Sequence, residues 1–177
     1  MAIYVYLRKR LTSQGLTTED ELRRPNRSLW RSRRFPWGDL EPGDRILLID
    51  HWRDEDRLSW ELSVTDVHHQ RVTSKAEAVS FLVETYGIPE EVLDDDVYLA
   101  GKEDGPGVLL AWCGEQTRRL NLPRPPGLKI ARHGWGRLDE QTAERLVAEA
   151  ATLVTPLTDL APAVPAGNER EQLTSHA

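Results

Sequence analysis

The sequence predicts an α+β domain: a small, strongly bent antiparallel or mixed β-sheet, forming a partial β-barrel, with two main flanking helices. Several apolar runs have the length and alternation of strands, and two segments combine helical periodicity with capping residues. The strands are separated by long excursions rather than by regular crossover helices. This spacing argues against a doubly wound parallel sheet.

The first half of the chain contains three expected strands. Thr18 and Glu21 have the spacing of a capping box, which predicts one or two helical turns inside the polar stretch after the first strand. The turn at residues 39–44 and the charged turn at 53–57 delimit the second and third strands, which we expect to form an antiparallel hairpin. The expected strands are residues 3–7, 45–50 and 58–64.

The second half begins with the clearest helix, residues 75–86. Ser74 is a suitable N-cap and Gly87 a suitable residue to end the helix, and residues 89–96 predict one more turn. We expect a second hairpin, residues 107–113 and 117–123, around Gly114. A short strand at 127–132 and a helix at 139–154 complete the expected elements.

The length of 177 residues fits one domain, residues 1–154, followed by a tail. Residues 155–177 are rich in Pro, Ala, Thr and Glu without periodicity, so we expect a disordered tail. No apolar run reaches the roughly 18–20 residues of a membrane helix. The N-terminus lacks the pattern of a signal peptide, so a cytoplasmic protein is expected.

Charge is distributed unevenly along the chain. Residues 1–38 carry nine basic and three acidic side chains, a net of +6, within a protein whose net charge is −6. A basic face on an acidic protein can contact phosphate groups, and it can equally neutralise the protein's own acidic part.

Aromatic and basic residues are interleaved just before the expected strand at residues 45–50. Arg31, Arg33 and Arg34 lie between Trp30 and Trp37. Aromatic rings supply stacking surfaces for unstacked bases, and arginines supply phosphate contacts. The alternative is that both rings cover the end of a barrel while the arginines extend into solvent. Trp60 lies within an alternating strand, where core packing is the usual role.

The sequence shows no motif that predicts catalysis or a cofactor. It contains no phosphate loop, dinucleotide fingerprint, zinc-finger spacing or nucleophile elbow. The histidines have no metal-ligand spacing, and His133 lies in a glycine-flanked loop. We therefore expect no catalytic residues, no metal and no cofactor, and the sequence favours a binding module over an enzyme.

The layout resembles the PUA-like superfamily, particularly its EVE and ASCH-type branches. The resemblance rests on the turn and strand at residues 41–50, "EPGDRILLID", and on the strand at 58–67. It implies a small β-barrel that binds RNA or DNA, and in the EVE branch a pocket for a modified base. By position, Trp30 or Trp37 would form one pocket wall and Trp60 another. The ASCH-type Gly-x-Lys-x-x-Glu-x-Arg pattern is absent.

The sequence thus predicts a module that binds nucleic acid or a nucleotide in an aromatic pocket flanked by arginines. The predicted ligand-binding residues are Trp30, Arg31, Arg33, Arg34, Trp37 and Trp60. The alternative is a non-enzymatic protein-interaction module whose basic segment docks an acidic protein partner. Exposed or cleft-lining Trp30 and Trp37 would favour a ligand, whereas full burial would favour a scaffold role.

Overall fold

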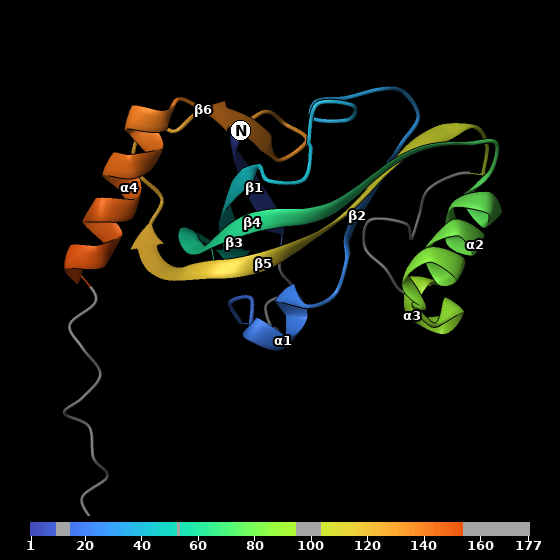
Figure 1. The fold of residues 1–177 in the computed structure, drawn as a ribbon, viewed down its shortest axis with the longest axis horizontal. Coiled ribbons are helices and arrows are strands. Elements are labelled where there is room, and N and C mark those ends of the chain that lie inside the picture. The colour runs from blue at the N-terminus through green and yellow to red at the C-terminus, as the bar shows by residue number, and fades with distance from the viewer. Residues whose placement is uncertain (10–14, 53, 95–103, 154–177) are drawn as a thin grey trace, which may run out of the picture.

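The computed structural model describes residues 1–9, 15–52, 54–94 and 104–153 (Figure 1). It is a mixed sheet curled into a half-barrel, with helices at both ends of the molecule. The strands are β1 (Ile3–Lys9), β2 (Asn26–Trp30), β3 (Arg45–Trp52), β4 (Glu55–Val72), β5 (Gly107–Pro123) and β6 (Trp135–Leu138). The helices are α1 (Glu19–Leu22), α2 (Lys75–Tyr86), α3 (Glu90–Asp94) and α4 (Glu140–Leu153).

The six strands form one sheet in the order β2-β5-β4-β3-β1-β6. Strands β1 and β3 pair in parallel, and the other neighbours pair antiparallel. The long strands β4 and β5 run from the end of the molecule that carries α4 to the end that carries α2 and α3 (Figure 1). This arrangement confirms the predicted α+β class and the partial barrel.

The aromatic contacts show the direction in which the sheet curls. Strands β5 and β6 are not neighbours in the sheet, yet the rings of Trp112 and Trp135 lie 6.0 Å apart. Tyr6 of β1 stacks on Trp135 at 4.3 Å and meets Trp112 edge-on at 6.1 Å. The face that carries these rings is therefore the inside of the half-barrel, and aromatic side chains fill it.

The opposite face of the sheet is covered by helices in two places. Helix α4 buries Leu146 and Val147 against Val5 and Leu47. Helix α2 buries Leu82 in a second apolar cluster, together with residues of α3, β2 and β5. Alternating strand residues thus divide between the aromatic inside and the helix-covered outside, as the period of a strand requires.

The predicted hairpin around Gly114 is wrong. Residues 107–123 form the single strand β5, which pairs with β4 along its length. Gly114 lies opposite Val64, beside one of three irregularities in the β4–β5 register, and a Cβ there would lie 3.2 Å from the carbonyl oxygen of Ser63. The glycine allows close backbone approach at a bend in a long strand, a role that the sequence alone does not separate from a turn.

The predicted strand at residues 127–132 is also wrong. Gly127 adopts a positive φ of 84°, and the amide of Gly134 donates to the carbonyl of Ala131 in a turn. The edge strand is β6, which follows this turn. Strand β2, at the opposite edge, lies in the stretch expected to be a polar excursion.

The local helix signals are confirmed. Thr18 and Glu21 form the complete capping box of α1. Ser74 caps α2 at its start, and Gly87 ends it in the left-handed conformation. Helices α3 and α4 fall within the predicted segments 89–96 and 139–154. The expected disordered tail, residues 155–177, lies outside the described residues.

Candidate functional site

A pocket of about 120 Å³ lies at the β2 edge of the half-barrel. It combines one aromatic ring with two arginines and a glycine-rich turn. Its lining residues are Leu29, Trp30, Arg31, Arg34, Gly105, Pro106 and Gly107. Three of the six residues predicted to bind a ligand, Trp30, Arg31 and Arg34, are therefore brought together here.

The pairing of β2 with β5 places Trp30 at the pocket. Trp30 is the last residue of β2 and lies opposite Val108, whose side chain belongs to the aromatic cluster inside the half-barrel. The neighbouring Gly107 is required by this pairing, because a Cβ there would lie 2.6 Å from the carbonyl oxygen of Trp30. Trp30 packs partly against the cluster and remains only partly buried.

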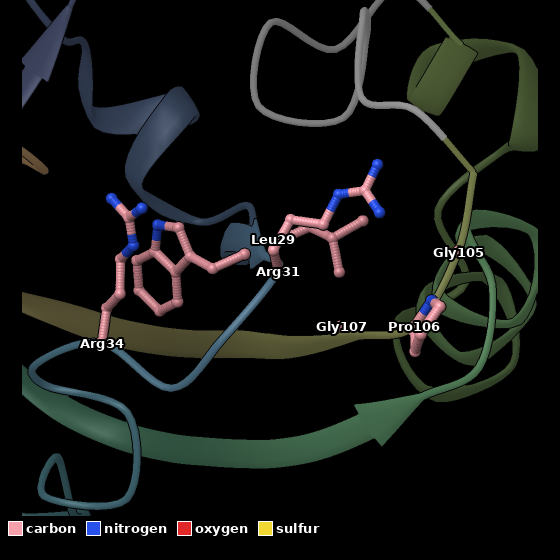
Figure 2. A pocket seen from close by; sticks show the side chains of 7 residues that line it. Leu29, Arg31, Arg34, Gly105, Pro106 and Gly107 are labelled. Carbon is pink, nitrogen blue, oxygen red and sulfur yellow. The ribbon is translucent and has the colours of Figure 1, made fainter.

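Two exposed arginines that line the pocket follow Trp30 in the chain. The guanidinium of Arg31 extends toward Gly105, where its Nη1 would lie 3.2 Å from an added Cβ (Figure 2). Arg34 lies on the opposite side of the view in Figure 2. Both side chains are solvent-exposed, so the pocket has a positively charged rim.

His133 extends the aromatic surface of the pocket. Its ring meets that of Trp30 edge-on, with centroids 6.5 Å apart. Burial, reinforced by the positive charge of Arg34, holds the pKa of His133 below its ordinary value. His133 precedes β6, so its contact with Trp30 joins the two edges of the open half-barrel.

Trp37 does not line this pocket. It is 8% exposed, and its indole Nε1 donates to the carbonyl oxygen of Leu109 at 3.1 Å. The guanidinium groups of Arg33 and Arg71 lie 5.5 Å and 5.4 Å from the ring centroid. Arg33 also donates from Nε to the carbonyl oxygen of Trp37. The geometry of Arg33 thus ties it to Trp37 rather than to the pocket.

Trp60 lies in the core, away from the pocket. It is 4% exposed, and its Nε1 donates to the carbonyl oxygen of Thr17 at 2.8 Å. Arg119 covers the ring at 5.6 Å. The rings therefore do not all favour the same prediction. Trp30 lines a pocket, which favours a ligand, whereas the burial of Trp37 favours a scaffold role. Trp60 is buried as well.

A second, larger pocket of about 550 Å³ lies at the β3–β4 turn. Nδ1 of His51 lies 2.6 Å from Oδ1 of Asp56, and Nη1 of Arg124 donates to Oδ2 of Asp56 at 2.7 Å. Burial alone would raise the pKa of Asp56, but these two hydrogen bonds lower it on balance. The carboxylate of Asp56 thus forms hydrogen bonds within the protein and links the β3–β4 hairpin to the residue after β5.

The described part of the chain contains no group of three or more His, Cys, Asp or Glu side chains able to hold a metal ion. Within the same residues, no helix has the length and apolar character needed to cross a bilayer.

Comparison with solved structures identifies the fold. The ASCH protein of Zymomonas mobilis superposes with a TM-score of 0.54 at 11% identity, over 83% of this chain and 94% of that chain. Two variants of the same protein give TM-scores of 0.53 and 0.54 at 12% and 14% identity, each over 84% of this chain. The chain therefore has an ASCH-type fold. No protein-family model matches its sequence, and neither does a curated protein.

Within this ASCH-type fold, the sequence reasoning missed several pocket residues. The sequence places His133 in a glycine-flanked loop, and it assigns no binding role to His133 or to residues 105–107. The available signal was the density of glycine around both segments, "GPG" and "HGWG", which permits close backbone approach. What the sequence does not show is that both segments meet Trp30: residues 105–107 lead into β5, which pairs with β2, and His133 precedes β6 at the other edge of the sheet.

Proposed function

We propose that this chain binds single-stranded nucleic acid at the Trp30 pocket. One base lies against the indole of Trp30, and Arg31 and Arg34 contact the flanking phosphates. The observation that carries the proposal is the position of Trp30 in a pocket rimmed by two exposed arginines. The PUA-like fold supports it, because nucleic-acid binding is the role that the family resemblance implies.

The size of the pocket limits how the base is held. A volume of about 120 Å³ is well below the roughly 300 Å³ at which pockets begin to enclose small molecules. The base therefore stacks at the mouth of the pocket, and only a small substituent of a modified base reaches inside. The apolar lining by Leu29 and Pro106 favours an apolar substituent there.

The arginines around Trp37 extend the positive surface beyond the pocket. Arg33 and Arg71 lie over the Trp37 ring, and Asp39, 3.9 Å from Arg33, offsets part of this positive charge. These cations add electrostatic attraction for a strand that runs across the pocket. Because the whole chain is acidic, with a net charge of −6, binding is local to this surface rather than a coating of any polyanion.

The test is fluorescence anisotropy with labelled single-stranded RNA and DNA of about ten nucleotides at low salt. Trp30→Ala removes the stacking surface, and Trp30→Phe retains a ring. Arg31→Ala with Arg34→Ala removes the rim charge. Arg145→Ala is the matched control, because Arg145 is exposed on α4, which covers the other face of the sheet. Absence of saturable binding by the wild type at high micromolar concentration overturns the proposal.

The alternative function is docking of an acidic protein partner by the same basic segment. The burial of Trp37 and Trp60 favours it, because these two rings act as scaffold. An acidic peptide distinguishes the two functions, since it needs the arginines but no stacking surface. If poly-glutamate binds with an affinity that Trp30→Ala leaves unchanged, and oligonucleotides do not bind, the docking function replaces nucleic-acid binding.

A further inference from the structure

Three buried nitrogen atoms have no hydrogen-bond partner within the part of the chain that the structure describes: Nη1 of Arg8, Nδ1 of His133 and Nε1 of Trp135. Trp135 is 1% exposed, so its indole N–H is removed from bulk solvent. Unpartnered buried polar atoms are uncommon in native proteins, and each calls for an explanation. Three such atoms in the edge strand β6, its preceding turn and the adjacent strand β1 indicate a common cause.

The backbone brings the three residues to one end of the β1–β6 edge. Tyr6 pairs with Trp135, and the amide of Leu7 donates to the carbonyl oxygen of Gly134 at 2.7 Å. Continuing this antiparallel register by one step sets Arg8 opposite His133. Arg8 lies two residues after Tyr6, so its side chain leaves β1 on the inner, aromatic face of the half-barrel.

The same end faces the Trp30 pocket. The ring of His133 contacts that of Trp30, and Trp135 contacts Trp112 on the strand that pairs with β2. The open seam between β2 and β6 is thus bridged by aromatic contacts at two levels. The unpartnered nitrogen atoms lie on the β1–β6 side of this seam.

The chemistry of the three atoms specifies the ligand. Arg8 carries a permanent positive charge, the indole N–H of Trp135 only donates, and Nδ1 of His133 donates in one tautomer or when protonated. A compact anion with several acceptor oxygens satisfies all three. The acid in register with Arg8 is Asp50, whose two carboxylate oxygens already accept from the amide and hydroxyl of Thr17.

We propose that the seam between β2 and β6 binds a terminal phosphate group through Arg8, His133 and Trp135. A phosphomonoester fits better than a base, because rings already fill the interior behind these atoms. The inference rests on the proposed function in one respect: with a base stacked on Trp30, the phosphate is that of a nucleotide or of a strand end. Free inorganic phosphate presents the same chemistry.

The first test monitors the indole N–H of Trp135 by two-dimensional ¹H–¹⁵N NMR. The signal is assigned by its disappearance in Trp135→Phe. We expect it to move on addition of inorganic phosphate or adenosine 5′-monophosphate, and to stay in place with chloride at equal ionic strength. The matched control is the indole N–H of Trp60, which is already bonded to Thr17 and is expected not to move.

The second test compares oligonucleotides that carry a 5′- or 3′-terminal phosphate with the same strands ending in hydroxyl groups. The wild type is expected to prefer one phosphorylated end by about tenfold or more, as charge-assisted bonds to a phosphate allow. Arg8→Met keeps a long apolar stem without charge. It is expected to abolish the preference, measured as the ratio of the affinities for phosphate-ended and hydroxyl-ended strands, because the loss of general charge attraction affects both strands alike.

The outcomes separate this inference from the proposed function. Equal affinity for both kinds of strand, with an unmoved Trp135 signal, overturns the phosphate site and leaves nucleic-acid binding intact. A Trp135 signal that moves with phosphate while no oligonucleotide binds supports the phosphate site and overturns the proposed function. If Trp135→Phe does not fold, Arg8→Met and the wild-type titration still decide the question.

Discussion

Trp30 and Trp37 belong to the same basic segment, yet the fold gives them different surroundings. Trp30 ends an edge strand and lines a pocket, whereas Trp37 lies over the sheet with its N–H bonded to Leu109. The arginines divide in the same way. Arg34 lies at the pocket and acts on His133, while Arg33 is held against Trp37. One stretch of sequence therefore contributes both to a surface pocket and to the core.

The difference follows from where each ring meets the sheet. Trp30 is at the β2 edge, where none of the described strands covers it, and its side chain is only partly buried. Trp37 is enclosed between the sheet and two guanidinium groups, with His69 edge-on at 5.9 Å. Cations over an aromatic face stabilise it and shield it from other ligands. A ring that is already covered by arginine is a poor stacking surface for a base.

The largest expected effect is on stability at Trp37. Trp37→Ala is expected to lower the free energy of unfolding by about 3–5 kcal/mol, the range for removal of a buried large aromatic side chain. Trp30→Ala removes a ring that is only partly buried, so its loss of stability is expected to be clearly smaller. Urea unfolding of both variants measures the difference. Equal losses would contradict the distinction between the two rings.

The next effect is on binding at Trp30. Trp30→Ala is expected to weaken binding of single-stranded RNA or DNA by about one to two orders of magnitude, the range for loss of one stacked base. Trp30→Phe is expected to restore most of the affinity, because a ring remains. Anisotropy titrations at fixed salt measure both. If Trp37→Phe, which keeps the core filled, weakens binding as much as Trp30→Ala, the division of roles is wrong.

A smaller effect concerns the salt dependence of binding. Arg31→Ala with Arg34→Ala is expected to flatten the slope of log affinity against log salt by about one to two units, since each phosphate contact releases about one counterion. Arg33→Ala is expected to change the slope less, because its guanidinium is engaged with Trp37. Titrations at several salt concentrations, with Arg145→Ala as control, test this order. A larger change for Arg33 than for the Arg31–Arg34 pair contradicts it.

The elements with local signals could be predicted from the sequence. The capping residues of α1 and α2, and the apolar periodicity of α4, need only neighbouring residues, and these helices were found correctly. Strand β2 has no such signal. It is a strand because residues about 80 positions later in β5 pair with it. Pairing of this range overrides local propensity, which marks the same residues as a polar loop.

The candidate site was predictable in composition but not in geometry. The interleaved aromatic and basic residues predicted a binding segment at residues 30–37. Three of the six residues predicted to bind a ligand line one pocket. Nothing local distinguishes Trp30 from Trp37, because the partner that buries Trp37, Leu109, is 72 residues away in sequence. The same applies to His133, which joins the site only because the curled sheet brings its two edges together.

The smallest expected effect is on histidine pKa values. Besides burial, Arg34 lowers the pKa of His133, whereas Arg33 lowers the pKa of His69. Burial and then Arg34 lower the pKa of His133. Because the unfolded chain keeps an ordinary pKa of about 6.5, it binds more protons than the folded chain between the two values. The free energy of unfolding therefore decreases as pH falls from about 6.5 toward the folded-state pKa, and then levels off with respect to this group.

Arg34→Ala is expected to raise the pKa of His133 toward its ordinary value and to reduce this dependence of stability on pH. The change is small, because Arg34 is exposed and salt screens its charge. NMR titration of the His133 imidazole measures it directly, with Arg33→Ala as the matched control. His69, whose pKa burial also lowers, gives a second signal in the same spectra: Arg33 acts on it, and Arg34 is not among its principal causes. Arg34→Ala is therefore expected to change the pKa of His133 more than the pKa of His69. A larger change for His69 would contradict the position of Arg34 beside His133.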